Sequence, residues 1–443
     1  MHTFKYSILF IGVVFAHDNE IQIPTLDPIQ LAASLDSLLI KQKSLTLEYH
    51  LKSYDVEDEY SNYYTIDSYK NADSVILQCD DKLNDRIIEK ILNPFMKIPI
   101  GNQFNQLGEG LVSKYYFINE NPNTYFGFID KQKLGALIIL KPNFNSFIAG
   151  AFGLNQRNNQ IKIVGELDID FENFLRNAEQ IKIVWKKNKD LSQKIKFSTF
   201  VPHLLGTEIG CFWRYDFENY NGFYTKSEQK IMLHAFLPIL NNTQIGYNKG
   251  KILSTQIGKN SGYVDGNFLG VSIKSELDTR DDRLLPLSGQ LFNLMIDGGL
   301  DGETRFIKTG LKHQVFFHIY NNTYANFQTH INGINYSSGL VPKSRYVYLG
   351  GASSFRGFNE QEFAFTQYQI FTMELINQQK SPLQLKSFID LGSNKFNLTE
   401  NYLFGYGLGI KQLNKNSIVS FEYSLGSKKQ KGGKIHIKWS AKL

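Results

Sequence analysis

The sequence predicts an all-β transmembrane barrel of antiparallel strands, preceded by a small α+β domain. After residue 142, apolar and polar side chains alternate along one segment after another, which is typical of strands with one apolar and one wet face. Aromatic residues make up 14% of a chain that is only 42% hydrophobic, a mixture that suits strands with aromatic girdles. Charged residues share the polar face, and a water-filled lumen tolerates them whereas a sandwich core does not.

The start of the chain, residues 1–16, is predicted to be a secretory signal peptide. Lys5 supplies the positive charge, an apolar run follows, and Val14-Phe15-Ala16 forms a small-residue cleavage site. An N-terminal core strand is the alternative interpretation. The run is too short for a membrane-spanning helix, which needs about 20 residues. A mature chain that crosses a membrane would therefore do so as a closed barrel.

Two segments precede the predicted barrel. Residues 17–60 form a short N-terminal segment, interpreted as part of a module, with a helix expected over 27–42 and a strand over 44–51. Residues 61–143 predict the order strand, helix, helix, strand, strand, with the elements expected at 64–69 and 74–77, 85–92, 103–117, 123–128 and 134–140. An unrelated small α+β domain with the same order of elements is the alternative interpretation.

Residues 144–443 are assigned to the barrel. They suffice for about 16 to 18 membrane strands of about 10 residues each, with their turns. The final strand shows the pattern most clearly, because Ile435, Ile437 and Trp439 alternate with Lys434 and Lys438. The apolar set is expected to face lipid and the charged set the lumen.

Composition and motifs argue against several other classes of protein. The net charge of +6 comes from scattered lysines, whereas a nucleic-acid surface needs a basic stripe with interleaved aromatics. Cys79 and Cys211 lie far apart, and no structural disulfide is expected. The sequence carries no nucleophile elbow, zinc-protease helix or phosphate loop, and its nine histidines are dispersed. We expect no enzyme activity, no metal site and no cofactor.

A glycine-flanked loop with one arginine is the most informative local feature, at residues 349–360. Gly350, Gly351 and Gly357 permit the positive-φ backbone that lets a chain fold back into a confined space. Arg356 is then a fixed charge at the tip, followed by Gly357 and Phe358. The predicted role is a loop that enters the lumen.

This Arg-Gly-Phe loop resembles the lumen loop of the BamA/TamA-type outer-membrane insertase and translocase superfamily, the bacterial surface antigen family, which is related to the mitochondrial sorting-and-assembly barrel. Other stretches agree in the same order: a polypeptide-transport-associated (POTRA) pattern, the hairpin at 278–289, Phe388-Ile-Asp-Leu-Gly392 and the final strand at 433–443. The resemblance implies a barrel of about sixteen strands and a periplasmic POTRA-like domain. One departure is the terminal Leu443, where many such barrels end in an aromatic residue.

The resemblance also implies partners for the loop arginine. Glu374 and Asp390 match the acidic positions on the inner wall of later strands, and both face opposite to their apolar neighbours. A guanidinium donates a planar fork to a carboxylate, which makes Arg356 suited to this role. Ordinary solvated lumen charges are the alternative. For the hairpin, two roles stay open, a solvated turn and an anchor for the loop; its residues are Asp278, Arg280, Asp281, Pro286 and Gly289.

The implied function is insertion of β-barrel proteins into the outer membrane, or translocation of polypeptides across it, through a weak seam between the first and last strands. A free strand edge offers a client somewhere to pair by β-augmentation. The expected seam residues are Phe144, Phe147, Gly433, Ile435, Ile437 and Trp439. Alternatives are a secretion translocator with one dedicated partner, and a passive pore or structural barrel.

The same reasoning predicts partners and location. The expected partners are unfolded outer-membrane or secreted polypeptides, the lipid bilayer and periplasmic accessory subunits, without nucleic acid. The expected location is the bacterial outer membrane, with the N-terminal domain in the periplasm. The mitochondrial outer membrane is the alternative.

Overall fold

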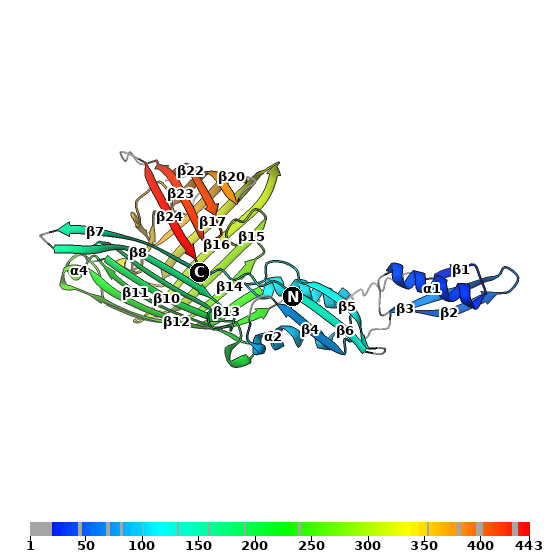
Figure 1. The fold of residues 1–443 in the computed structure, drawn as a ribbon. Coiled ribbons are helices and arrows are strands. Elements are labelled where there is room, and N and C mark those ends of the chain that lie inside the picture. The colour runs from blue at the N-terminus through cyan, green and yellow to red at the C-terminus, as the bar shows by residue number, and fades with distance from the viewer. Residues whose placement is uncertain are drawn as a thin grey trace, which may run out of the picture. The chain divides into compact units, whose positions relative to one another are not determined.

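A computed structural model describes most of the chain, and its overall course is drawn in Figure 1. The described residues are 20–42, 47–67, 71–79, 83–100, 102–130, 133–157, 160–189, 192–237, 241–351, 354–378, 382–395, 402–427 and 433–443. The predicted signal peptide lies outside them. Among the described helices, none combines the length and apolar character needed to cross a membrane.

The first module is a small sheet with one helix. Its elements are β1 (Glu20–Ile23), α1 (Pro28–Gln42), β2 (Leu47–Asp55) and β3 (Tyr60–Asp67). The strands are antiparallel in the order β1-β3-β2. The expected domain boundary at residue 60 therefore falls at the start of β3, and the strand predicted at 64–69 belongs mostly to this sheet rather than to the following domain. The two strands that pair with β3, namely β1 and β2, both precede it in the chain. The residues of β3 alone therefore do not show to which sheet the strand belongs.

The second module has the predicted order of strand, helix, helix, strand, strand. Its elements are β4 (Ser74–Cys79), α2 (Asp85–Leu92), the short η1 (Phe95–Lys97), α3 (Asn102–Lys114), β5 (Asn123–Asp130) and β6 (Lys133–Leu140), with sheet order β4-β6-β5. The Asn84 side chain caps α2 by accepting a hydrogen bond from the Arg86 amide. Ile87 and Ile91 lie one turn apart and are buried. This arrangement is consistent with a POTRA-like domain.

Sixteen antiparallel strands form a closed barrel, which confirms the predicted fold class. In order they are β7 (Phe147–Arg157), β8 (Gln160–Glu172), β9 (Gln180–Lys189), β10 (Ser192–Val201), β11 (Gly210–Tyr220), β12 (Tyr224–Leu237), β13 (Asn241–Ser254), β14 (Gly266–Asp278), β15 (Gly289–Asp301), β16 (Thr304–Tyr320), β17 (Thr323–Tyr336), β20 (Gln367–Gln378), β21 (Leu383–Ser393), β22 (Leu403–Leu413), β23 (Ser417–Gly426) and β24 (Lys434–Lys442).

The two faces of the barrel wall differ as the alternation predicts. On β14, Leu269 and Val271 are more than half exposed on the outer face, whereas Ser272 on the inner face is buried. The inner face carries charges in pairs: the Lys230 ammonium lies 2.6 Å from the Asp297 carboxylate, and both side chains are buried inside the barrel. Lipid accepts the outer set, and pairing offsets the desolvation of the inner set.

Residues 337–366 connect β17 to β20 and form the lumen loop. Within this loop β18 (Val347–Leu349) pairs with β19 (Phe363–Phe365) as a short hairpin. Phe355 and Phe358 are fully buried against this hairpin, in one apolar cluster with Tyr368 and Ile370 of β20. The loop is therefore packed on the inner wall by its own hydrophobic core.

Candidate functional site

The structure brings together the loop arginine and both predicted acidic residues. Arg356 Nη1 donates to Glu374 Oε1 over 2.6 Å, while Nη2 and Nε donate to the two oxygens of Asp390 over 2.6 and 2.9 Å. The guanidinium also lies 3.5 Å from the ring centroid of Phe388. All three charged residues are at most 7% exposed. They are thus a shielded ion cluster, not solvated lumen charges.

The surrounding strands complete the hydrogen bonding of this cluster. Asn326 of β17 donates to Glu374 over 2.8 Å, and Thr372 of β20 donates to Asp390 over 2.8 Å. The backbone amide of Arg356 donates to Asp390 as well. Because a buried charge is costly unless it is paired and hydrogen-bonded, this network makes the loop position specific.

Three loop glycines adopt backbone conformations that other residues rarely reach. The φ angles of Gly350, Gly351 and Gly357 are +122°, +99° and +88°. A Cβ on Gly357 would lie 2.5 Å from the carbonyl oxygen of Leu425, which β23 presents to the loop. The glycines predicted from sequence therefore serve both the turn and the close approach of the loop to the wall.

Glycines of the barrel wall receive the loop, and sequence analysis missed them. A Cβ added at Gly392 would lie 2.7 Å from the Phe355 ring. A Cβ added at Gly405 would lie 2.0 Å from the Arg356 carbonyl oxygen, and one added at Gly426 would lie 2.6 Å from the Gly357 carbonyl oxygen. We call Gly392, Gly405 and Gly426 the glycine cradle. One signal of the cradle is present in the sequence: Gly405, Gly407 and Gly409 recur at every second residue. In a strand, this spacing leaves one face without side chains.

Gly405→Ala is expected to destabilise the folded barrel by about 1–3 kcal/mol, because the new methyl group would overlap loop backbone that cannot yield without moving Arg356. The matched control is Gly409→Ala on the same strand, whose Cβ would meet side-chain atoms of Lys386 and Glu422 rather than loop backbone. The thermal midpoint of the folded band in heat-modifiability gels measures both. Equal midpoints for the two variants would contradict the role of the cradle.

A second contact, which no pattern in the sequence predicts, holds the first half of the loop. The Arg345 guanidinium lies over the rings of Phe268 (3.7 Å) and Phe306 (4.6 Å), with Asp301 at 3.6 Å. Tyr348 lies 3.4 Å from the hydroxyl of Tyr224 on β12. The loop therefore contacts the wall at β12 and β14–β16 through Tyr348 and Arg345, and the wall at β20–β23 through Arg356 and Gly357.

The predicted hairpin motif is the turn between β14 and β15. Arg280 forms a two-pronged ion pair with Asp278, and one Asp281 oxygen accepts three backbone amides of the turn. Pro286 lies in the turn, and Gly289 closes it at φ +87°, where a Cβ would lie 2.0 Å from the carbonyl oxygen of Thr279. The turn is therefore internally ordered, not a freely solvated strand end.

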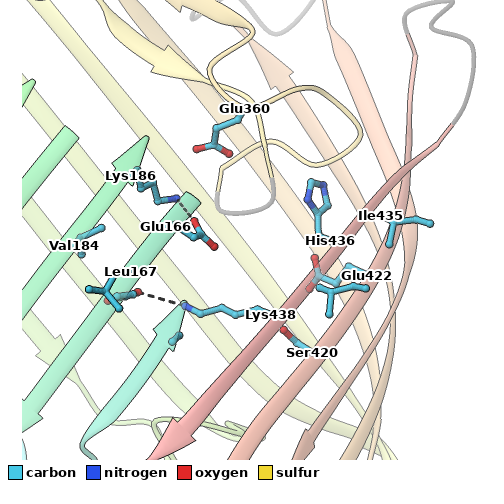
Figure 2. A pocket seen from close by; sticks show the side chains of 13 residues that line it. Glu166, Leu167, Val184, Lys186, Glu360, Ser420, Glu422, Ile435, His436 and Lys438 are labelled. Carbon is cyan, nitrogen blue, oxygen red and sulfur yellow. Dashed lines mark hydrogen bonds and ion pairs between the residues drawn. The ribbon is translucent and has the colours of Figure 1, made fainter. Parts of the chain in front are cut away.

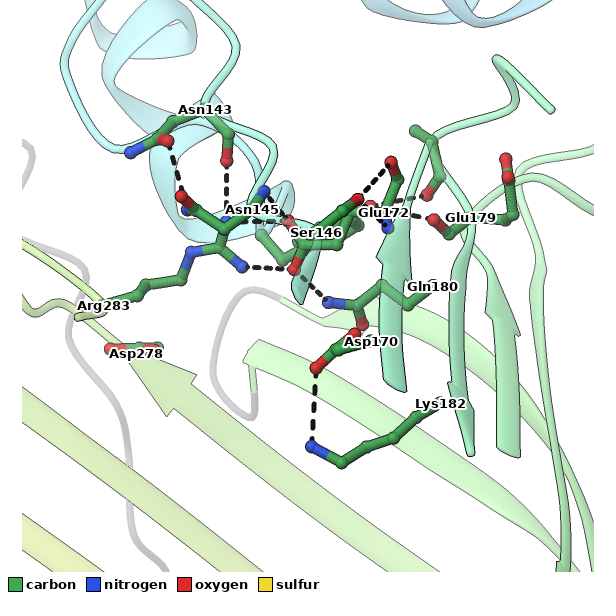
Figure 3. A network of polar contacts seen from close by, with 12 residues as sticks. Asn143, Asn145, Ser146, Asp170, Glu172, Glu179, Gln180, Lys182, Asp278 and Arg283 are labelled. Carbon is green, nitrogen blue, oxygen red and sulfur yellow. Dashed lines mark hydrogen bonds and ion pairs between the residues drawn. The ribbon is translucent and has the colours of Figure 1, made fainter. Parts of the chain in front are cut away.

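Figure 3 shows the Arg283 side chain reaching from this turn toward Asn145 and Glu172. It donates to both Glu172 oxygens over 2.8 and 3.0 Å and to the Asn143 carbonyl oxygen over 2.7 Å. Burial alone would lower the pKa of Arg283, but hydrogen bonds and charge from Glu172 raise it. These contacts tie the turn to the segment that enters β7 and to the end of β8.

The seam between the first and last strands is short. Among the described residues, β7 and β24 pair at three positions, Phe147–Lys442, Ile148–Ala441 and Ala149–Ser440, whereas every other neighbouring pair of barrel strands has eight or more. The pairing ends at Ala149, and Figure 1 shows β7 and β24 running apart. A cavity of about 480 Å³ opens there, lined by both strands and by the lumen loop.

The predicted seam residues fall into four groups. Phe147 pairs across the seam, and Ile435, Ile437 and Trp439 lie on the diverging part of β24 with 54–69% of their surface exposed. Gly433 precedes β24, where a Cβ would overlap the Tyr423 ring. Phe144 was wrongly assigned to the seam: it precedes β7 and stacks on Phe117 at a centroid distance of 4.9 Å. The apolar contact with Phe117 determines where the Phe144 ring lies, because Phe144 is not part of the alternating strand.

Side chains also cross the seam where the backbone does not. Lys438 of β24 lies 3.5 Å from Asp168 of β8 across the seam, whereas the Lys186–Glu166 pair at 3.2 Å joins β9 to β8 on one side of it (Figure 2). The Lys438–Asp168 pair is partly exposed, so it contributes only about 0–1 kcal/mol to closure of the seam. Both the backbone pairing and the side-chain contact therefore hold the seam only weakly.

Within the parts of the chain that the structure covers, no three His, Cys, Asp or Glu side chains are grouped as metal ligands would be. The site consists instead of a loop fixed inside a barrel and a wall with one weak closure. Such geometry defines the class of transmembrane β-barrels that carry a loop folded into the lumen.

Comparison with known proteins agrees with this class. The model of the Omp85 superfamily domain matches residues 173–440, more than half of the chain. The chain belongs to the Omp85 superfamily. This confirms the family expected from the loop, and its members are non-enzymatic insertases and translocators of outer membranes. No curated protein matches the chain.

Solved structures share the fold at low sequence identity. BamA from Haemophilus ducreyi lacking POTRA domains 1–3 has 12% identity and a TM-score of 0.55, over 93% of this chain and 94% of that one. CdiB from Escherichia coli has 13% identity and a TM-score of 0.57, over 94% and 84%. CdiB from Acinetobacter baumannii has 14% identity and a TM-score of 0.56, over 94% and 81%. Family and fold agree with the expected bacterial outer membrane.

Proposed function

We propose that this protein inserts β-barrel proteins into the outer membrane through the seam between β7 and β24. The observation that supports this most is the three-residue pairing of the two strands in an otherwise fully paired barrel. The unpaired remainder leaves backbone donors and acceptors on two strand edges. A client strand gains hydrogen bonds by pairing with them.

The rest of the site suits a barrel that stays folded while its seam opens. Arg356 and the glycine cradle fix the loop to β20–β23, the strands on the β24 side, and Arg345 fixes it to the opposite wall. Most of the barrel wall is held by ladders of eight or more pairs. Opening is therefore confined to the one place where little backbone pairing has to break.

A secretion translocator with one dedicated partner is the second candidate. The fold likeness to CdiB is as close as the likeness to BamA, so the fold does not favour one over the other. In this case the partner would pass the lumen or pair with the same seam. We propose in either case that residues 71–140, the POTRA-like module, receive clients in the periplasm.

Depletion of the protein, followed by quantitative proteomics of the outer membrane and the medium, separates the candidates. An insertase predicts that many unrelated barrels disappear from the outer membrane. Loss of a single secreted protein with all barrels at normal levels would establish the translocator instead. Unchanged levels of both would reject both roles and leave a passive pore or structural barrel.

A further inference from the structure

The β14–β15 turn, residues 279–288, is built to hold a fixed shape. Besides the three amides bound by Asp281, the Asp282 side chain accepts the amides of Leu284 and Leu285 over 2.6 and 2.7 Å. Leu285 is buried. Two aspartates thus satisfy five backbone amides inside a short turn, which leaves Arg283 and Leu284 in defined positions.

This turn reaches the inner side of the seam. Leu284 lines a cavity of about 310 Å³ together with Phe147 and Ala149 of β7 and with Lys438 and Ser440 of β24. Phe147, Ala149 and Ser440 belong to the three-position pairing, and Lys438 lies two residues beyond it on β24. Although β14 and β15 lie far around the barrel from the seam, their connection stands directly behind it.

One attachment of the turn is on the β7 side of the seam. Arg283 holds the Glu172 carboxylate with two hydrogen bonds, and the same carboxylate accepts the Asn145 amide over 2.7 Å. Asn145 lies two residues before β7, and Glu172 is the last residue of β8. Glu172 is 8% exposed, so the pair is shielded from solvent.

The other attachment is on the β24 side. Lys411 of β22 donates a hydrogen bond from its ammonium group to the carbonyl oxygen of Leu284. The strand order across the seam is β22-β23-β24-β7-β8. Arg283 and Leu284 are adjacent in the chain, yet their partners lie on opposite sides of the seam.

We propose that the β14–β15 turn is a brace that clamps the seam shut from inside, with Arg283 and Lys411 as its two positioning residues. This inference rests on the proposed function, because it describes how that seam is regulated. If β7 and β8 move away from β22–β24, at least one attachment must break. The brace therefore adds resistance where backbone pairing supplies only three positions, and a client that displaces the turn releases the seam.

A single cysteine at position 440 reports on the seam without any client. In a chain carrying Cys79→Ser, Cys211→Ser and Ser440→Cys, the new thiol lies at the innermost seam pair, where Ser440 is 8% exposed. Its rate of alkylation by a maleimide in detergent micelles measures how often the seam opens. Because no client is present, a failure of the proposed function leaves this readout unaffected.

Arg283→Ala and Lys411→Met are each expected to raise the alkylation rate about tenfold, the factor for losing a hydrogen bond to a charged group. The control is Lys308→Met, which removes a lysine from β16, away from the turn's attachments, and is expected to leave the rate unchanged. Heat-modifiability gels verify that each variant barrel is folded. If Arg283→Ala does not fold, the alkylation rate of Lys411→Met tests the brace by itself. The proposal would be overturned if the folded variants were alkylated no faster than the chain with Ser440→Cys alone. It would also be overturned if Lys308→Met raised the alkylation rate equally.

Discussion

Arg356→Ala is expected to destabilise the barrel by about 3–5 kcal/mol, the effect of leaving a buried charge without its partner. Both Glu374 and Asp390 lose hydrogen bonds of 2.6 Å, and both are almost fully buried. The denaturant midpoint of the barrel in liposomes or micelles measures the loss. Arg356→Lys is expected to lose less, because an ammonium keeps the charge but not the planar fork.

A double variant distinguishes a lost charge pair from a general packing defect. Arg356→Ala combined with Asp390→Asn removes one of the stranded carboxylates, so it is expected to be more stable than Arg356→Ala alone. If the second substitution instead lowers stability further by its full separate amount, the two residues are independent and the ion cluster does not lock the loop.

A disulfide across the seam is expected to abolish client assembly. Ala149 and Ser440 face each other at the innermost seam pair, and both are small and buried. The Leu443 amide donates to the Ser146 carbonyl oxygen, so alternation along the ladder makes Ala149–Ser440 a non-hydrogen-bonded pair. Such pairs bring Cα atoms to about 4.5 Å, within the range that a disulfide spans.

Assembly is measured as the rate at which a pulse-labelled barrel client becomes protease-resistant in membranes. The Ala149→Cys/Ser440→Cys chain, in a background without Cys79 and Cys211, is expected to stop assembly when oxidised and to restore it when reduced. Each single cysteine variant is the control and is expected to assemble clients normally. Normal assembly by the oxidised double variant would remove seam opening from the mechanism.

Much of the fold follows from local pattern. The alternation of Ile435, Ile437 and Trp439 with lysines gives β24 its two faces, and the apolar spacing of 85–92 gives α2 its bounds. Such features depend on neighbours within a few residues, so one sequence carries them. The number of strands follows from length because every membrane strand has to span the same thickness.

Partners across the barrel are harder to predict. Arg283 and Glu172 are 111 residues apart, and no local rule connects them. Phe144 has the character of a strand residue, yet its ring packs on Phe117. The acidic partners of Arg356 were named only because the family resemblance pointed to them, since periodicity alone shows which face a residue occupies and not what lies opposite.

The most direct test of the account is capture of a client strand at the seam. A client arrested during assembly carries cysteines along its terminal strand, and single cysteines are placed at 151 and 153 on β7, at 437 and 439 on β24, and at 271 and 273 on β14. If clients pair at the seam, disulfides are expected to β7 and β24 in a register that shifts by two residues from one position to the next, and none to β14. Equal capture at β14, or no capture at either seam strand while clients still assemble, would contradict it.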